Sequence, residues 1–414
     1  MSLDLHTLDE SDLPEWLRAL NNGFLAPPAV SPEELAARKP GLDLDRTQGV
    51  FDEGRCVATF RSAPRELTVP GGDRLAASAV TNVTVTATHR RRGLATRMMS
   101  HDLAAAKERG EAVAILIAAE YPIYGRYGFG PATWTNEWDV DIPRAGLDRR
   151  WSGPAEGRID LLTPAEIRKI GPELHERFRR LTPGAIDRPD RWWDLDTGQL
   201  SFPSRPWKEP FYAAYRSDSG QVDGLASYFV TEHRWANKFP KMTLRTSGLI
   251  AASPAAERAL WRYLFSIDWV TELKSGFRAP DDVMPLLLGD PRAARVETNA
   301  DFMWLRILDT PRALAARTYT GAGSLVLDLR DAAGLAGGRF RLETDPDGRA
   351  SCTPTGDAPD LSLDIADLGT LYLGDESVQR LAVLGRVTEH RPGAVPRADT
   401  LFRTPRRPWN PDSF

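Results

Sequence analysis

The sequence contains few cysteines and no long apolar segment. Cys56 and Cys352 are the only two cysteines among 414 residues, and they lie far apart and match no metal-binding spacing. Two isolated thiols indicate a reducing compartment. No stretch of about 18 apolar residues is present to span a membrane, and residues 1–6 have neither the basic nor the apolar region of a secretory signal. We therefore expect a cytoplasmic protein with no metal centre and no membrane partner.

The charge of the chain and a missing motif exclude further classes. The formal net charge is -4, which argues against nucleic acid as the main partner. A GxGxxG dinucleotide-binding fingerprint is absent. The chain is 42% hydrophobic and 27% charged, as is ordinary for a soluble globular protein. Its length predicts about three domains.

A strand, a turn and a helix follow one another between residues 82 and 119. The β-branched residues from Val83 onward predict a strand that ends before Arg90. Apolar residues then recur at helical spacing, and Gly110 is a suitable helix stop. These helical positions are Ala95, Met98, Met99, Leu103 and Ala106. The apolar run Val113–Ala118 predicts a strand buried on both faces, so the segment forms one βαβ unit.

The turn of this unit, Arg90-x-x-Gly93-x-Ala95, has the features of a pyrophosphate site. A helix start offers unpaired N–H groups and a partial positive charge. Gly93 and Ala95 leave room for phosphates to approach the backbone, and Arg90 to Arg92 add charge and bidentate donors. The alternatives are a solvated charge run and a nucleic-acid patch. The position between a buried strand and a helix favours the anion site.

The segment Ala119–Gly130 follows the buried strand and contains three tyrosines, Tyr121, Tyr124 and Tyr127, among several glycines. Together with the turn, it resembles the GCN5-related N-acetyltransferases, whose acyl-CoA signature has the same form. More closely, the chain resembles the enhanced intracellular survival (Eis) family of these enzymes along its whole length. The stretches that carry this resemblance are His89–Leu94, Ile123–Thr133, Trp304–Ile307, Pro311–Leu314, Cys352–Thr355, Leu371–Gly374 and the terminal Phe414.

The resemblance implies an α+β fold of mixed sheets, with two tandem acetyltransferase-like domains followed by a sterol-carrier-protein-like α+β domain. We place the domains at 1–150, 151–298 and 299–414, with the first boundary in the Pro/Gly-rich stretch 143–157. The second domain repeats the strand–helix pattern, with a strand at 242–250 and a helix containing Leu260, Leu264 and Ile267. Residues 254–259 then take the place of the phosphate turn and lack its glycine. Only the N-terminal copy is therefore expected to bind CoA.

The third region changes to strand patterns. Leu325, Leu327 and Leu329 alternate with other residues, residues 340–342 alternate weakly, and residues 345–348 give a strong turn signal. Alternation returns at residues 361–365, before a helical region at 368–373 that Gly374 closes. The sequence itself supports an α+β domain and demonstrates no bound lipid.

The resemblance also implies which residues hold acetyl-CoA. The strand edge Val83, Thr84 and Val85 would bind the pantetheine through backbone hydrogen bonds. The turn and helix start would bind the pyrophosphate, and this set consists of Arg91, Arg92, Gly93, Leu94, Ala95 and Thr96. Ala119 and Glu120 would flank the thioester. The family often has serine in place of Ala119, so a hydroxyl contact is missing there.

The same resemblance assigns two catalytic groups. Tyr124 would protonate the departing thiolate, and the α-carboxylate of Phe414 would act as general base. A phenol has a reference pKa of about 10 and a thiol one of about 8.5, so full proton transfer is uphill by only about 2 kcal/mol. An α-carboxyl, with a reference pKa of about 3.5, is a weak base for an ammonium and needs desolvation, a relaying water or a neutral amine. The alternatives are a core aromatic at Tyr124 and an ordinary disordered chain end at Phe414.

The acceptor is implied only as a class, namely aminoglycosides or lysine ε-amines. Phe24 lies in a plausible pocket loop, whereas Ala26 and Ser413 stand where acidic residues would be useful. Glu33, Glu34 or Asp412 are candidate acidic replacements. The resemblance further implies a homohexamer, for which tryptophans such as Trp192 and Trp193 are candidate interface residues. A noncatalytic acyl-CoA-binding or lipid-binding protein is the alternative function, and His89 and His101 are expected to be surface residues.

Overall fold

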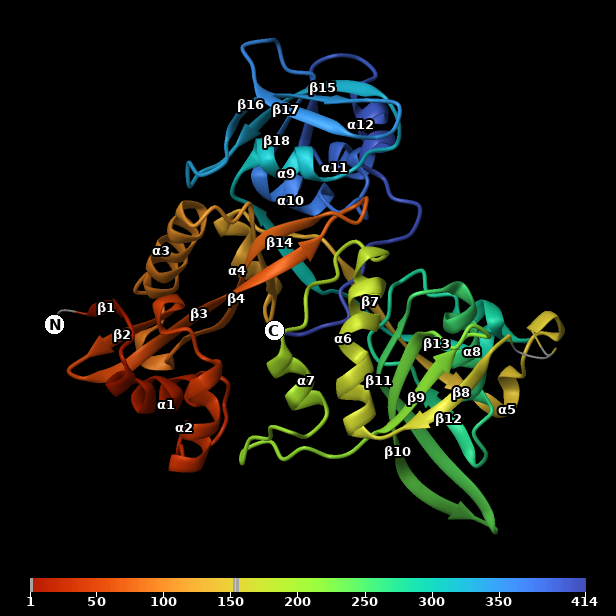
Figure 1. Ribbon diagram of the computed structural model, residues 1–414. Coiled ribbons are helices and arrows are strands. Elements are labelled where there is room, and N and C mark those ends of the chain that lie inside the picture. Colours follow the sequence, from red (N-terminus) through yellow and green to blue (C-terminus); the bar gives the residue numbers. More distant parts are fainter. Residues whose placement is uncertain (1–2, 152, 154–155) are drawn as a thin grey trace.

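The computed structural model describes residues 3–151, 153 and 156–414, which form three sheets with helices packed on them (Figure 1). The first sheet has the order β1-β2-β3-β4-β5-β14-β6. Its strands are β1 (Asp4–Thr7), β2 (Thr47–Asp52), β3 (Arg55–Thr68), β4 (Arg74–Val85), β5 (Val113–Ile117), β6 (Gly130–Pro131) and β14 (Met303–Ile307). Its helices are α1 (Leu13–Gly23), α2 (Pro32–Arg38), α3 (Leu94–Glu108) and α4 (Tyr121–Tyr124).

The predicted βαβ unit is present. β4 and β5 are parallel, with Ala77–Val80 opposite Val113–Leu116, and α3 connects them. The apolar stripe of α3 is buried against the sheet, because Met98, Met99 and Leu103 face the core that contains Val80 and Leu116. α3 ends at Glu108, and Gly110, with φ 78°, follows the C-cap residue Arg109.

The points at which the chain passes from one sheet to the next differ from the predicted domain boundaries. β7 (Trp134–Asp141) already belongs to the second sheet, so the chain leaves the first sheet near residue 133 instead of 150. β14 returns to the first sheet between β5 and β6, although residues 299–414 are predicted as the third domain. All five residues of β14 are buried, so pairing on both edges explains why this strand completes the first core.

The second sheet has the order β13-β7-β12-β11-β10-β9-β8. Its further strands are β8 (Arg158–Leu162), β9 (Phe211–Arg216), β10 (Val222–Ala236), β11 (Phe239–Ala251), β12 (Val270–Lys274) and β13 (Ala294–Asp301). Its helices are α5 (Ile142–Ala145), α6 (Pro164–Arg180), α7 (Asp190–Asp196) and α8 (Pro254–Phe265). β11, α8 and the parallel β12 repeat the unit of the first sheet, as predicted, except that Ile267 lies beyond the end of α8.

The start of α8 is closed to a phosphate. Ser253 caps the helix by accepting a hydrogen bond from the Ala256 N–H at 3.2 Å, and Pro254 has no N–H to offer. Glu257 stands in the first turn. The second copy therefore lacks the free donors of an anion site, in agreement with its sequence.

The third sheet has the order β17-β16-β15-β18-β19. Its strands are β15 (Gly323–Arg330), β16 (Gly338–Thr344), β17 (Ala350–Pro354), β18 (Leu361–Asp364) and β19 (Val387–Glu389). Its helices are α9 (Thr310–Ala316), α10 (Ile365–Leu371), α11 (Val378–Val383) and α12 (Ala394–Phe402). The turn at 345–348 joins β16 to β17, and the predicted helix at 368–373 begins earlier, because Asp364 caps it by accepting from the Ala366 N–H.

The third domain packs directly on the first sheet. A Cβ atom at Gly130 would lie 2.0 Å from the Ala366 carbonyl oxygen, and one at Gly369 would lie 2.3 Å from the Leu305 carbonyl oxygen. These glycines let α10 approach β6 and β14 closely. Within the described residues, no helix is long and apolar enough to cross a membrane.

Candidate active site

A bulge in β4 opens the first sheet. Asn82 has φ 55°, and its carbonyl oxygen accepts a 2.8 Å hydrogen bond from the Thr59 hydroxyl, which also contacts the Thr84 hydroxyl at 2.7 Å. The pairing of β4 with β5 ends at Val80, just before this bulge. Beyond the bulge, Thr84 and Val85 pair with β3, and in the described part of the chain residues 83–85 do not pair with β5. Their other edge therefore has backbone groups free for an extended ligand.

The end of α1 lies against this same strand. A Cβ atom at Gly23 would lie 2.3 Å from the Thr84 Cβ, so only glycine permits the contact. The following residues, Phe24 and Leu25, are exposed. The loop after α1 thus stands beside the free edge of β4 with apolar side chains facing solvent.

The predicted phosphate turn has the geometry of an anion site. Gly93 is the N-terminal cap of α3 with φ 74°, and no side chain caps the first N–H groups of this helix. Arg90, Arg91 and Arg92 are exposed, as is Gly93 itself. Free N–H groups, a left-handed glycine and three guanidinium groups together fit a pyrophosphate.

The residues on either side of the turn hold it in place. Leu94 is buried in the core under α3. The predicted surface residue His89 is half-buried, and its Nε2 lies 3.0 Å from Asp52 Oδ2. Thr96 is exposed, and its hydroxyl lies 3.2 Å from the Tyr127 hydroxyl. The turn is therefore rigid on its protein side and open on its solvent side.

The three tyrosines differ in burial. Tyr124 is 8% exposed at the end of α4, whereas Tyr121 is 53% exposed and lies edge-on against Trp304. Burial raises the pKa of the Tyr124 hydroxyl, and the neighbouring Tyr127 and Glu120 raise it further. Tyr124 thus holds its proton throughout the neutral range, as a general acid must. Ala119 and Glu120 are exposed between β5 and α4.

The C-terminus reaches the bulged strand. The Thr81 hydroxyl donates a 3.0 Å hydrogen bond to a terminal oxygen of Phe414, and Thr81 directly precedes the bulge residue Asn82. The ring of Phe414 packs against the core shared by the first and third domains. The terminal carboxylate is therefore fixed beside the free edge of β4, and Thr81 is a site residue that no sequence motif marks.

Buried contacts fix the tail that leads to this end. The backbone N–H of Trp409 donates a 2.9 Å hydrogen bond to the Pro183 carbonyl oxygen, and the Trp409 ring packs edge-on against Phe178. Asp412 is buried and forms a bidentate ion pair with Arg188, whose Nη2 lies 2.7 Å from Asp412 Oδ1. Burial pushes the pKa of Asp412 upward, but Arg188 and His175 together outweigh burial and hold this pKa below its ordinary value.

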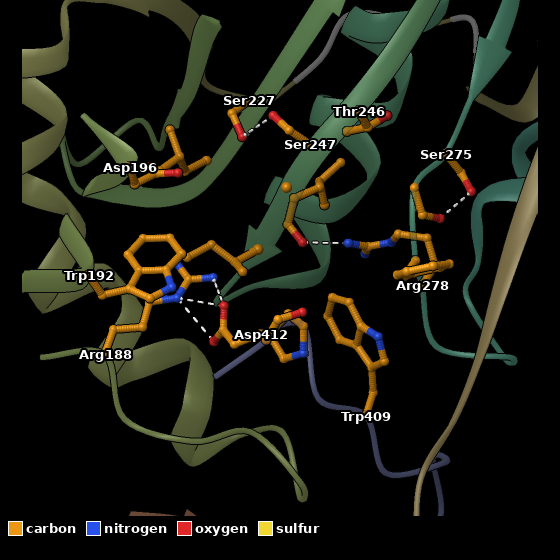
Figure 2. A pocket seen from close by; sticks show the side chains of 18 of the residues that line it. Arg188, Trp192, Asp196, Ser227, Thr246, Ser247, Ser275, Arg278, Trp409 and Asp412 are labelled. Atoms are coloured by element: carbon orange, nitrogen blue, oxygen red, sulfur yellow. Dashed lines mark hydrogen bonds and ion pairs between the residues drawn. The ribbon is translucent and has the colours of Figure 1, made fainter. Parts of the chain in front are cut away.

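Two adjoining cavities lie where the tail crosses the second domain, and their volumes are about 360 and 610 Å³. Figure 2 shows the smaller one. Both are bordered by Trp192, Asp196, Arg205, Ser247 and Ser413. Ser413 directly precedes Phe414, so the cavities adjoin the residue that bears the terminal carboxylate.

The predicted acidic candidates are not available to a cation in these cavities. Glu34 is buried and paired with Arg38 at 2.5 Å, and Asp412 is occupied by Arg188. Glu33 is exposed and bonded to Ser31. The carboxyl that borders both cavities is Asp196, which the sequence reasoning missed because one aspartate at a helix end carries no distinctive pattern.

The two predicted interface tryptophans have other roles. Trp193 is 2% exposed within the core of the second domain. Trp192 lines the cavities, and the Arg188 guanidinium carbon lies 3.8 Å from the centroid of its ring. Three strongly exposed aromatic residues lie close to the end of the β10–β11 hairpin, namely Trp235, Phe239 and the adjacent Trp269.

Comparisons with known proteins agree with this geometry. Residues 4–132 and residues 184–307 each match a family model described as an acetyltransferase (GNAT) domain, and residues 310–411 match a sterol carrier protein domain. An N-acetyltransferase Eis of Mycobacterium tuberculosis is 36% identical over 341 residues, which cover 81% of this chain and 80% of that protein. The chain belongs to the Eis family of N-acetyltransferases. An uncharacterized N-acetyltransferase of Streptomyces avermitilis is 59% identical over 100% of this chain and 99% of its own length.

Solved structures show the same three-domain arrangement for the Eis family. Eis1 from Mycobacterium abscessus superimposes with a TM-score of 0.84 at 31% identity, covering 99% of this chain and all of that protein. A GCN5-related N-acetyltransferase from Anabaena variabilis has a TM-score of 0.83 at 19% identity, which shows the fold alone. The predicted family and α+β fold are confirmed, and an acyl-CoA is the donor that acetyltransferases of this type use.

Proposed function

We propose that this enzyme transfers the acetyl group of acetyl-CoA to a primary amine of a small molecule, with aminoglycosides and lysine ε-amines as the acceptors that the family resemblance suggests. The observation that carries the proposal is the 3.0 Å hydrogen bond from Thr81 to the terminal carboxylate of Phe414. It fixes a proton acceptor beside the free edge of β4, whereas an ordinary chain end lies unbound in solvent.

In this proposal the first domain binds acetyl-CoA. Residues 83–85 accept and donate backbone hydrogen bonds along the pantetheine, and the exposed turn from Arg91 to Thr96 holds the pyrophosphate. Ala119 and Glu120 stand at the thioester end, where β5 stops. The left-handed Gly93 and the uncapped helix start support this placement.

The transfer itself is a direct attack. The amine nitrogen forms a bond to the thioester carbonyl carbon, and the carbon–sulfur bond breaks. The Tyr124 hydroxyl gives its proton to the leaving sulfur, and the Phe414 carboxylate takes the proton that the amine loses. The raised pKa of Tyr124 supports its role, because this hydroxyl stays protonated until the sulfur develops charge.

The weak basicity of the Phe414 carboxylate is the main difficulty that this mechanism must overcome. Its reference pKa of about 3.5 lies far below that of an ammonium, so it cannot deprotonate a bound cation at low cost. It can accept the proton of an amine that is already bonding to carbon, since this nitrogen becomes far more acidic during attack.

Thiol release tests the proposal. Wild-type protein with acetyl-CoA should release free CoA only when an amine is added, and mass spectrometry should find one acetyl group on that amine. If acetyl-CoA binds tightly but no amine in a broad panel releases CoA, the protein is the alternative noncatalytic acyl-CoA-binding protein. A buried location for both cysteines means that the protein's own thiols add little background.

We extend the proposal to a homohexamer in the cytoplasm. The aromatic group at the end of the β10–β11 hairpin supports self-association, because Trp235 and Trp269 lie 5.8 Å apart between ring centroids and are each 61% exposed. Sedimentation at micromolar concentration should give a hexamer, and Trp235→Glu should shift it toward smaller species. A wild-type monomer would contradict the extension.

A further inference from the structure

Asp196 stands where the two cavities meet, at the last position of α7. Among the residues that the structure describes, its carboxyl group makes no hydrogen bond or ion pair. Its backbone carbonyl instead accepts hydrogen bonds from the Trp207 indole at 2.9 Å and the Tyr212 hydroxyl at 2.7 Å. The backbone is therefore fixed while the carboxyl remains available to a ligand.

The remaining charges on the cavity walls oppose a polycation. Arg188 is neutralised by Asp412, and Arg278 is neutralised by Asp282 at 2.8 Å. The lining charges that have no ion pair within the described part of the chain are one carboxyl, on Asp196, and two cations, on Arg205 and Lys208. A ligand with many amines would therefore meet more repulsion than attraction.

The larger cavity has aromatic walls. Its lining includes Trp192, Phe202, Trp207 and Phe229. Trp192 is held by the Arg188 guanidinium stacked on it, and Trp207 is held by its indole hydrogen bond. In the smaller cavity, which Figure 2 shows, Asp196 and Trp192 lie on one side, with Ser227 and Ser247 across from them. Such fixed rings favour a flat apolar body, as rigid aromatic walls do in ligand sites.

We infer that the acceptor is an amine with an aromatic body and one further basic nitrogen, and that Asp196 binds this second nitrogen. The inference rests on the proposed function, because the first nitrogen must reach the Phe414 carboxylate to be acetylated. Ser413 borders both cavities and directly precedes Phe414, so the cavities border the residue before the proposed base. One carboxyl and an aromatic wall thus replace the acidic lining that a polycation requires.

The protonation state of Asp196 makes the attraction for the second nitrogen depend on pH. Burial raises its pKa to about 6, Arg188 opposes this rise, and Asp412 adds to it. His175 lies behind Asp412, and burial lowers its pKa, so it stays neutral near pH 7. Arg205 lines both cavities, and Lys208 lines the larger one. Attraction for a second cation therefore grows as the pH rises through about 6.

Matched pairs of amines test the inference. Aryl diamines of increasing length are compared with monoamines in which a methyl group replaces one amine. For the best diamine, wild-type kcat/KM should exceed that of its monoamine by about tenfold, mostly through KM, because a charge-assisted hydrogen bond has this strength. In Asp196→Asn the ratio should fall to about 1 through a rise in the KM of the diamine.

Asp194→Asn is the matched control, because it changes a carboxylate of the same helix that borders neither cavity. This variant should keep the wild-type ratio. Between about pH 5 and pH 7 the ratio should rise in wild type and stay flat in Asp196→Asn. The ionisation of the reacting amine is common to both members of a pair, so it cancels in the ratio.

Two outcomes would overturn the inference while leaving the acetyltransferase proposal intact. One is an unchanged ratio in Asp196→Asn, and the other is a higher kcat/KM for spermine than for every aryl diamine. If no amine releases CoA, the proposed function fails instead. In that case, calorimetric titration with each diamine and its monoamine tests the site without turnover, and equal affinities would overturn it.

Discussion

The hydroxyl of Thr81 on β4 donates a 3.0 Å hydrogen bond to a terminal oxygen of Phe414, the last residue of the chain. The partners are 333 residues apart, and the contact joins the first domain to a tail that leaves the third domain and crosses the second. A side-chain carboxylate tolerates neighbours on either side in sequence, but an α-carboxylate exists only at a chain end. Under the proposed mechanism, residues added after Phe414 would therefore remove the base.

Adding residues after Phe414 should abolish transfer without unfolding the protein. A Gly-Ser extension converts the terminal carboxylate to a neutral amide, and we expect kcat to fall by about 10²-fold or more. The Kd for acetyl-CoA should stay unchanged, because the phosphate turn lies in another domain. Turnover, calorimetry and melting temperature measure the three expectations.

The same residues added before Met1 provide the control and should leave kcat unchanged. Thr81→Val gives a milder test, because it removes the hydrogen bond to the carboxylate and keeps the shape of the side chain. We expect kcat to fall several-fold in this variant, by roughly the value of one charge-assisted hydrogen bond. Full turnover in the extended protein would contradict the terminal base and favour a relay through the exposed Glu120.

Tyr124→Phe should lower kcat by about 10²- to 10⁴-fold with little change in the KM for acetyl-CoA. The hydroxyl matters chiefly as the sulfur leaves, and the ring that packs edge-on against Phe129 is retained. Burial raises the pKa of Tyr124, so the alkaline fall of kcat in wild type should lie above the ordinary value of 10.0. Tyr121→Phe changes an exposed hydroxyl and is the control. If Tyr121→Phe is the slower variant, the acid role moves to that residue.

Gly93→Glu should weaken acetyl-CoA binding by more than Gly93→Ala does. Both variants place a side chain at φ 74°, which costs about 1–2 kcal/mol, and a Cβ atom there meets no protein atom of the described residues within 4 Å. Only glutamate adds a negative charge where phosphates bind, so we expect a loss of about 10²-fold beyond that of alanine. Calorimetry separates the two effects. Equal losses would mean that backbone strain, and not the phosphate space, limits binding.

The local parts of the site could be predicted from sequence, because neighbouring residues determine them. Gly93, the arginines before it and the apolar stripe of α3 form one continuous segment, and the structure places them as predicted. The strand β14 could not be placed in this way. Its five buried residues are typical of any buried strand, and only the edges of β5 and β6 select its partners.

The cavity residues were missed for a related reason. Asp196 and Ser247 come from different elements, and their meeting depends on how α7 packs against β11 and the tail. The positions of Trp192 and Trp193 could not be predicted from the sequence either. Their sequence indicates aromatic burial, but it does not distinguish an interface from a cavity wall or a core position.

Asp412→Asn should release the tail and lower kcat by about tenfold or more, because it leaves Arg188 buried without its partner. Breaking a buried pair costs about 3–5 kcal/mol. The tail can leave its groove at lower cost than global unfolding, so we expect rapid hydrogen exchange at 409–414 with a modest change in melting temperature. Asp331→Asn is the control, because it breaks the buried pair with Arg306 away from the tail. That variant should lower the melting temperature and leave exchange in the tail slow.

The ion pair between Asp412 and Arg188 also predicts how hydrogen exchange in the tail depends on pH. The pKa of Asp412 lies below its ordinary value of 3.8 in the folded protein, because Arg188 and His175 together outweigh burial. A carboxyl with a depressed pKa contributes stability above its unfolded pKa, and this stability is lost as the pH falls through the folded value. Hydrogen exchange in the tail should therefore stay slow from neutral pH down to about 4 and accelerate below that. Acceleration near pH 6 would assign the control of the tail to His175, which lies 3.6 Å from Asp412, instead of to the ion pair.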